Sequence, residues 1–394
     1  MLEIDRRTLL ARLAASGAVL AFPRGALAGE AEWFAAARKD ESGAFSAALF
    51  DLRNGDVRAV ELPERGHDIA LKPDGSAWVA FARRPGRFGV AVPMESGKPV
   101  WFRASAERHF FGHGVFSADG RLLYVTENDY ARGQGVISVR DATGGYEEIG
   151  AFTAHGVEPH DVALLGDGRT IVVANGGILT HSDKGATELN LPDMRPSLVY
   201  LDAATGDLIE EQKLSADLHQ LSIRHLAIAA DDTVVFGCQY RGPEAEAPAL
   251  IGFHRRGQVP VIVEADGPTQ IGLRNYIGSV AADTSGGIVA ASAPKGGLVT
   301  YWDVASRRYL GASALADGCG LAPTHKSASF LLTSGEEAGW SRRTQAAERR
   351  AKPRPINGTT TPSWCGDPSR ARSGWPILTL FLGLESRTGR EYAG

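Results

Sequence analysis

The chain has only three cysteines among its 394 residues. Cys238, Cys319 and Cys365 form no CxxC pair, which excludes a paired-cysteine zinc knuckle and a disulfide framework. No Gly-x-Ser-x-Gly, His-Glu-x-x-His or other complete catalytic motif is present either. The formal net charge is -4 and no basic stripe with interleaved aromatics exists, so the sequence predicts no nucleic-acid partner.

Long apolar runs are also missing beyond the N-terminal region. No later stretch approaches the ~18–20 apolar residues that span a bilayer. Within residues 1–28, Asp5-Arg6-Arg7-Thr8-Leu9-Leu10 resembles a twin-arginine export signal, and Ala26-Leu27-Ala28 offers small residues for cleavage. Leu9 replaces the commoner phenylalanine and Arg12 interrupts the apolar region; a surface helix with two chance arginines is the alternative. We expect a signal peptide, a periplasmic location and no stable membrane insertion after cleavage.

A repeated unit is what the sequence does contain. Each unit opens a short apolar strand, turns at an acidic or glycine pair, and enters a second apolar strand. The six units begin at His67, His113, His160, His225, Ser279 and Cys319, and the first two steps are 46 and 47 residues long. Repeats of roughly 40–50 residues with several strands each are typical of a β-propeller, in which equivalent inner strands surround one axis.

Three further predicted strands, Trp33–Lys39, Phe45–Asp51 and Val57–Leu62, have no inner strand before them. Six complete units and this orphan set predict an all-β, seven-bladed propeller over residues 31–335. Propellers often close by pairing the two ends of the chain in one blade, which removes exposed sheet edges. The missing inner strand should therefore come from the C-terminus.

The C-terminal sequence does not supply that strand in recognisable form. From about residue 336 to 394 the strand–turn rhythm stops and Arg, Ser, Thr, Pro and Trp become frequent. Asn357–Trp364 can be encoded by codons whose other frame reads Trp-Asp-Asn-His-Pro-Ile-Leu, a peptide with a histidine that opens an apolar strand. We interpret this segment as a frameshifted, disordered tail, which would leave the last, closing blade incomplete. A genuine disordered tail with a chance codon coincidence is the alternative.

The repeated histidines are the candidate functional residues, because equivalent inner-strand positions converge on one channel. The predicted ligand set is His67, His113, His160, His225 and Cys319. Imidazole suits Fe, Cu and Zn, so the cluster predicts a site for a transition metal, iron or copper, or for a haem-like group. Asp68, Asp161 and Arg224 adjoin the ring and are expected to orient the imidazoles. Two alternatives stay open: a structural polar ring that fixes blade register, and a catalytic acid–base role.

Four other histidines lie outside this register and are expected in surface or loop positions: His155, His181, His219 and His254. The acidic cluster Glu127-Asn128-Asp129 fits a turn, with a cation site as the alternative. The insertion Ile178–Leu198 is long enough to carry function on a rigid scaffold, and we expect it to cover one mouth of the channel.

Several motifs together resemble a bacterial domain-of-unknown-function family, number 1513, over about residues 1–335. They are Thr126-Glu127-Asn128-Asp129-Tyr130, Glu158-Pro159-His160-Asp161, Ala174-Asn175-Gly176-Gly177-Ile178 and Ser222-Ile223-Arg224-His225-Leu226-Ala227. The resemblance implies an exported seven-bladed propeller that ends in a Trp-Asp-Asn-His segment. The family's gene neighbours, imelysin-type iron-uptake proteins and a dihaem peroxidase-like protein, imply a periplasmic role and partners linked to iron uptake.

Two functions therefore follow from the sequence. The first is a periplasmic propeller that binds a metal or cofactor through its channel histidines and serves iron handling. The second is a non-catalytic interaction scaffold with a structural polar channel. An enzyme is a weaker third reading, because no complete catalytic constellation is present.

Overall fold

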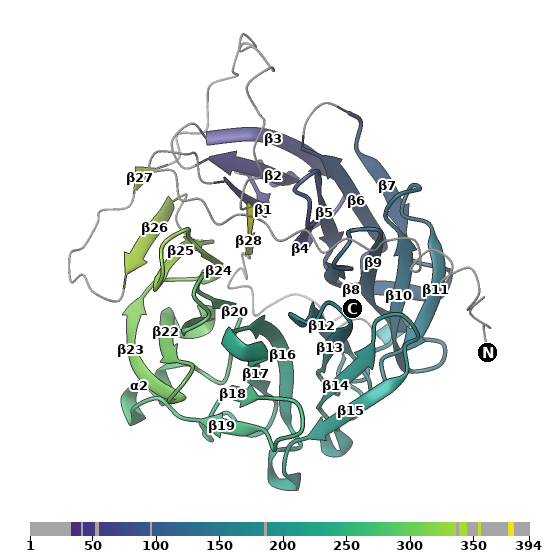
Figure 1. The fold of residues 1–394 in the computed structure, drawn as a ribbon. Coiled ribbons are helices and arrows are strands. Elements are labelled where there is room, and N and C mark those ends of the chain that lie inside the picture. Colours follow the sequence, from purple (N-terminus) through teal and green to yellow (C-terminus); the bar gives the residue numbers. More distant parts are fainter. Residues whose placement is uncertain are drawn as a thin grey trace.

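The computed structural model describes residues 33–40, 42–51, 55–94, 97–184, 187–335, 339–344, 354–355 and 377–381. These residues form an all-β structure with one short α-helix, α2 (Gly267–Gly272), and five single-turn 3-10 helices. The strands build seven four-stranded sheets, which Figure 1 shows arranged in a ring around a central axis.

Each sheet takes consecutive strands of the chain, with one exception at the closing sheet. The first four sheets in the chain are β28-β1-β2-β3, with β1 (Trp33–Lys39), β2 (Phe45–Asp51), β3 (Gly55–Leu62) and β28 (Ile377–Phe381); β4 (Gly66–Leu71), β5 (Ala77–Ala82), β6 (Phe88–Pro93) and β7 (Val100–Arg103); β8 (Arg108–Phe116), β9 (Leu122–Asp129), β10 (Gln134–Asp141) and β11 (Glu148–Thr153); and β12 (Pro159–Leu164), β13 (Thr170–Asn175), β14 (Ser197–Asp202) and β15 (Leu208–Lys213).

The remaining three sheets complete the ring. They are β16 (Leu221–Ile228), β17 (Val234–Tyr240), β18 (Ile251–His254) and β19 (Val261–Val263); β20 (Ser279–Ala282), β21 (Ile288–Ala293), β22 (Leu298–Asp303) and β23 (Arg308–Ala314); and β24 (Gly318–Pro323), β25 (Ser329–Ser334), β26 (Gly339–Thr344) and β27 (Arg354–Pro355). The inner strands β4, β8, β12, β16, β20, β24 and β28 each contact the next, and β28 contacts β4. The β-propeller predicted from the repeats is therefore the fold.

The turn between the first two strands of a unit repeats the same chemistry. The Asp74, Asp119 and Asp167 side chains each accept a hydrogen bond from the backbone N–H two residues later, at 2.8–3.1 Å. The following Gly75, Gly120 and Gly168 adopt φ of +64° to +70°. Asp-Gly is favoured at such turns because glycine reaches the left-handed region without steric cost and aspartate bonds its own backbone.

The core lies between neighbouring sheets rather than in a single layer. The second strands of the units are buried on both faces: every residue of β9 and β13 is buried, and only the first residue of β5 and β21 is not. One apolar cluster runs from Val172 of β13 through Phe236 of β17 to Trp302 of β22, all fully buried. Continuous packing of this kind fixes the inner strands around the axis.

The structure differs from the expectation that residues 336–394 add no strand. Within that segment β26 and β27 extend the sheet of β24, and β28 occupies the inner position beside β1. This sheet therefore has four strands where an incomplete blade is expected. β28 runs parallel to β1, whereas every other described strand pair in the sheets is antiparallel. The rest of the segment, like the predicted signal peptide in residues 1–28, lies outside the described residues.

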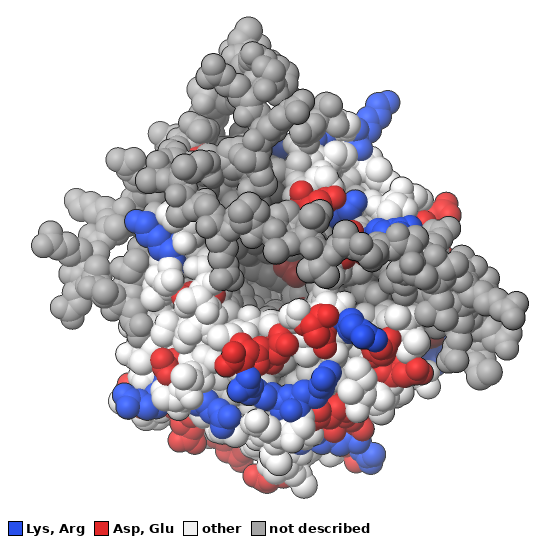
Figure 2. Space-filling model, in the orientation of Figure 1, with Lys and Arg blue, Asp and Glu red and all other residues white. Residues whose placement is uncertain are grey.

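The visible surface carries charges of both signs. Figure 2 shows acidic and basic side chains interspersed over the described part of this face, with a hollow at the centre of the ring. Among the described helices, none is long and apolar enough to cross a membrane.

Candidate functional site

Four of the five predicted ligand residues come together at the axis. His67, His113, His160 and His225 lie on the inner strands β4, β8, β12 and β16. The ring centroids of His67 and His113 are 4.8 Å apart, those of His113 and His160 are 5.2 Å apart, and those of His160 and His225 are 4.9 Å apart. The spacing of the repeats thus produces a cluster of imidazoles, which we call the histidine ring.

A local irregularity of the inner strands places these side chains. The register of the inner strand against its neighbour shifts between Gly66 and Ile69, between Phe110 and Gly114, and between Pro159 and Asp161. Equivalent shifts occur between Ile223 and His225 on β16 and between Gly318 and Gly320 on β24. Each shift coincides with the predicted site residue or its immediate neighbour. β-Bulges re-aim side chains in this way, and they allow consecutive residues to face one side.

The inner strand β20 provides an internal comparison. Its unit has Ser279 where the others have histidine or cysteine, and its pairing with β21 runs from Ser279 to Ala282 without a shift. The bulge therefore accompanies the channel-facing histidine or cysteine and is not a general property of these strands.

Gly112 makes room for the first histidine of the ring. Its φ is +107°, a conformation that favours glycine, and a Cβ at this position would meet the His67 Cδ2 atom at 2.3 Å. The glycine therefore serves the contact between β8 and the His67 imidazole.

His113 is held by carboxylates. Its Nδ1 lies 3.1 Å from Asp68 Oδ2 and 3.3 Å from Asp161 Oδ1. The Nδ1–H donates to these acceptors, so the neutral ring carries its lone pair on Nε2. Although burial opposes the charged form, the carboxylates of Asp161 and Asp68 raise the pKa of His113 above its usual value. A carboxylate behind one imidazole nitrogen is the arrangement that orients histidine ligands toward metals.

His160 is held by a cation instead. The guanidinium of Arg224 donates to His160 Nδ1 over 3.1 Å. Because a guanidinium can only donate, Nδ1 is the acceptor and the neutral ring carries its proton on Nε2. Burial, followed by the charge of Arg224, lowers the pKa of His160 well below its usual value. His160 therefore presents an N–H donor where His113 presents a lone pair.

The remaining two imidazoles, like that of His160, are held neutral. Burial lowers the pKa values of His67 and His225 well below the usual value, and the charge of His113 adds to the effect. Neutral imidazole is the form that binds metal ions. One ring nitrogen each of His67, His113 and His160 lies within 4.8 Å of the others. Nitrogens that share one ion at about 2.0–2.1 Å are at most ~4.2 Å apart, so the side chains must move closer together before all three can share one ion.

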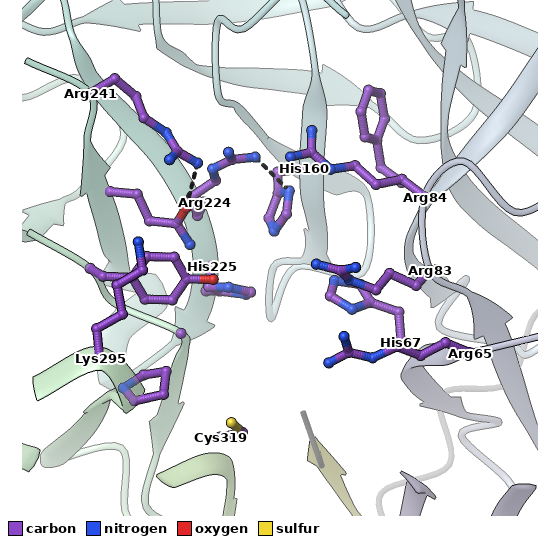
Figure 3. Close-up of a pocket in the computed structure, with 15 residues that line it drawn as sticks. Arg65, His67, Arg83, Arg84, His160, Arg224, His225, Arg241, Lys295 and Cys319 are labelled. Carbon is purple, nitrogen blue, oxygen red and sulfur yellow. Dashed lines mark hydrogen bonds between the residues drawn. The ribbon is translucent and has the colours of Figure 1, made fainter. Parts of the chain in front are cut away.

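Cys319 lies at the same cavity but outside this group. It is buried on β24 and its thiol donates to Asp317 Oδ1 over 3.2 Å. Figure 3 draws it apart from the labelled histidines, across the opening. The repeat places Cys319 in the equivalent position of another sheet, and the distance across the ring keeps it from His67, His113 and His160.

Glu158 is the functional residue that sequence reasoning missed. It is fully buried, and its Oε1 accepts hydrogen bonds from the guanidiniums of Arg84, at 2.6 Å, and Arg224. Its Oε2 accepts from the backbone N–H of Ile178 at 3.2 Å. The φ of Glu158 is +59°, a strained conformation for a residue with a side chain. A signal existed in the sequence, because Glu158 directly precedes the Pro159-His160 start of its unit.

Two other predictions resolve differently. The acidic cluster is divided: Asp129 accepts from the Arg132 backbone N–H at 3.1 Å in the turn after β9, as expected, whereas Glu127 is buried on β9 and pairs with Arg140 at 2.8 Å and Arg108 at 3.6 Å. His254 is not a surface residue. It is buried at the end of β18 and hydrogen-bonds the Tyr200 hydroxyl.

The insertion after β13 lies beside the channel mouth. Its Glu188 forms an ion pair of 3.4 Å with Arg241, which lines the central cavity. The Leu191 carbonyl accepts from Gln220 immediately before β16. These contacts bring the insertion to the side of the ring where the inner strands β12 and β16 begin.

Comparisons with known proteins agree with the fold. Residues 60–359 match the family described as a protein of unknown function (DUF1513), so the match continues past residue 335. Hydrazine synthase of Kuenenia stuttgartiensis is similar in structure, with a TM-score of 0.60 and 15% identity over 82% of this chain and 99% of that chain. The Cps50 (Swd1) β-propeller domain of Myceliophteria thermophila gives a TM-score of 0.47 and 17% identity over 69% and 83% of the two chains. No curated protein matches. At these identities the structural likeness concerns the fold alone.

Proposed function

Because the chain belongs to the DUF1513 family of proteins of unknown function, we propose a function from its channel: the protein binds a transition-metal ion through the histidine ring. The observation that carries this proposal is the group of His67, His113 and His160, whose ring nitrogens lie within 4.8 Å of one another. Imidazole ligands suit copper and iron, the two metals we favour, and also zinc.

The histidines differ in how directly a ring nitrogen can bind the metal ion. His113 is set to bind through Nε2, because Asp68 and Asp161 hold its Nδ1–H. His67, in edge contact with His113, is its nearest partner. His160 joins only if its Nδ1 leaves Arg224 or its Nε2 proton is lost, so His225, 4.9 Å from the His160 ring, is the alternative third ligand. Cys319 is a ligand only after rearrangement across the cavity.

The metal is tested on the full chain stripped with a chelator. Copper(II) and iron(II) are titrated separately, and bound metal is counted per chain after gel filtration. We expect one ion per chain, and His113→Ala to weaken binding at least about 100-fold, since it removes both a ligand and its carboxylate support. His219→Ala is the matched control, because that ring bonds its own 3-10 helix away from the channel. Equal binding by wild type and His113→Ala would refute the site.

The non-catalytic scaffold is the second candidate. It is favoured by a specific observation: His113 and His160 already form hydrogen bonds within the protein, as a polar ring that fixes blade register requires. If the protein is such a scaffold, it retains no metal after gel filtration. His113→Ala then lowers the free energy of unfolding without changing the metal content.

The seven sheets support the finer proposal of a seven-bladed propeller. The twin-arginine-like motif Asp5–Leu10 supports the proposal that it is exported to the periplasm, and the family resemblance supports the proposal that it serves iron uptake with partner proteins there. We also propose that the native closing strand is encoded in the other reading frame near residue 357. The parallel direction of β28 against β1 agrees with a replacement strand. Sequencing the gene tests this: a single uninterrupted frame with no Trp-Asp-Asn-His reading removes it.

A further inference from the structure

The central cavity is lined by many cations. It has a volume of about 160 Å³, and Figure 3 shows long basic side chains around it. Six of the lining residues are cationic: Arg65, Arg83, Arg84, Arg224, Arg241 and Lys295. Among the described lining residues there is no aspartate or glutamate. His67, His160 and His225 line the same space, so the cavity adjoins the histidine ring.

The cations come from one face of the propeller. Arg65 precedes β4, Arg83 and Arg84 follow β5, Arg241 follows β17, and Lys295 follows β21. These positions are loops at the side where the inner strands begin and the second strands end. Loops on a rigid scaffold are where binding residues gather, and here separate sheets contribute charges of the same sign to one space.

Two carboxylates pair with three of these cations. Glu158 pairs with Arg84 and Arg224, and Glu188 pairs with Arg241. Six cations thus line the cavity and none of its described lining residues is acidic, in a chain whose net charge is -4. Burial of cations is costly without matching negative charge. Burial lowers the pKa of Arg224 to about 10, which reflects that cost.

The hydrogen-bonding atoms have the same preference. Guanidinium and ammonium groups only donate hydrogen bonds. The neutral His160 ring, whose Nδ1 accepts from Arg224, carries a further N–H donor on Nε2. Arginine forks match the paired oxygens of carboxylate and phosphate groups. A cavity of about 160 Å³ is smaller than the ~300–1,000 Å³ typical of drug-sized ligands, which favours a compact ion.

We propose that this cavity is a binding site for a small multivalent oxyanion, a phosphate or a di- or tricarboxylate. The anion takes its contacts from the arginines and Lys295 on one side and from the His160 N–H on the other. The site requires no metal, and therefore it stands or falls separately from the metal proposal.

The experiment is calorimetric titration of the full chain at low ionic strength, after metal is removed with a chelator and the chelator is dialysed away. The probes are phosphate, citrate and succinate, with acetate as the monovalent control. We expect at least one multivalent probe to bind one per chain and acetate to bind at least about tenfold more weakly, because a multivalent anion engages several charged donors at once. Preference for citrate or succinate identifies a carboxylate ligand, and preference for phosphate identifies a phosphate ligand.

The key variant is Arg65→Gln, with Arg65→Lys as the conservative change. Arg103→Gln is the control, because Arg103 is exposed on the outer strand β7 and its loss alters the net charge equally. We expect Arg65→Gln to weaken the best anion about tenfold or more, Arg65→Lys to weaken it less, and Arg103→Gln to leave it unchanged. Unaltered thermal unfolding of Arg65→Gln establishes that the fold persists. Absence of binding by every multivalent probe, or equal losses in Arg65→Gln and Arg103→Gln, would overturn the proposal.

Discussion

His113 and His160 are neighbours in the histidine ring, with centroids 5.2 Å apart, yet opposite charges hold them. Asp68 and Asp161 accept from the Nδ1–H of His113, whereas Arg224 donates to the Nδ1 of His160. The pKa of His113 is raised and that of His160 is lowered. Two chemically identical side chains on equivalent strands therefore present a lone pair on one side of the channel and an N–H donor on the other.

The difference shows that the sequence repeat determines where each imidazole lies but not which tautomer it adopts. The bulges bring both rings to the axis, and the residues around each ring then decide its tautomer. We call the two parts the carboxylate side, around His113, and the arginine side, around His160. We propose a metal ion for the first and an anion for the second.

The largest effect is expected from a substitution that disrupts the arginine side and lowers the free energy of unfolding. Glu158→Gln removes the only carboxylate that the described structure pairs with the buried guanidinium of Arg224. Loss of one partner of a buried ion pair costs about 3–5 kcal/mol, and we expect the free energy of unfolding in urea to fall by about that amount. Glu211→Gln, which breaks a surface pair with Lys213, should change it by less than ~1 kcal/mol. Similar free energies of unfolding for the two variants would show that the Glu158–Arg224 ion pair does not stabilise the fold.

The second prediction weakens the carboxylate side without removing a ligand. Asp68→Asn combined with Asp161→Asn keeps the shape around His113 but removes the negative charge behind its Nδ1. Loss of such supporting carboxylates typically lowers metal affinity ~10–100-fold. Competition titration against a chelating dye measures the change. Asp183→Asn serves as the control, because this exposed acid lies in the insertion and pairs with His181. Unchanged affinity in the double variant would mean that His113 does not bind the metal.

The third prediction joins the two sides. An anion on the arginine side reduces the positive charge next to the metal, so each ligand should strengthen the other by the same factor. We expect a weakly chelating anion such as sulfate to raise copper affinity about fivefold, within the usual range of such couplings. Arg65→Gln should abolish this increase. No change in metal affinity at saturating sulfate, with the metal's solution binding corrected, would show that the two sites are uncoupled, and a decrease would show that the two ligands compete.

Much of the architecture could be predicted because hydrophobic alternation and turn residues act locally. The expected strands Trp33–Lys39 and Phe45–Asp51 coincide with β1 and β2. The convergence of the histidines followed from their shared register. The bulges did not follow, because a one-residue shift depends on the pairing partner and leaves no mark in the composition of the strand.

The arginine side could not be predicted for a different reason. Arg65 and Arg84 flank two paired strands of one sheet, but Arg241 follows a strand of another sheet, and only closure of the ring brings it to the same cavity. The sequence singles out Glu158 only as part of the Glu158-Pro159-His160-Asp161 motif, and its ion pairs could not be predicted because its partners lie 74 and 66 residues away. Strand β28 pairs within a segment whose composition lacks the repeat pattern, and pairing with β1 depends on the edge that the ring leaves available.

The tautomers of His113 and His160 test the central claim most directly. Nitrogen-15 NMR of histidine-labelled, metal-free protein near pH 8 distinguishes Nδ1–H from Nε2–H, and the variants His113→Ala and His160→Ala assign the signals. The account predicts Nδ1–H for His113 and Nε2–H for His160, with the His160 pattern lost in Arg224→Gln if that variant folds and in Glu158→Gln otherwise. The same tautomer on both rings would contradict the division of the channel into a carboxylate side and an arginine side.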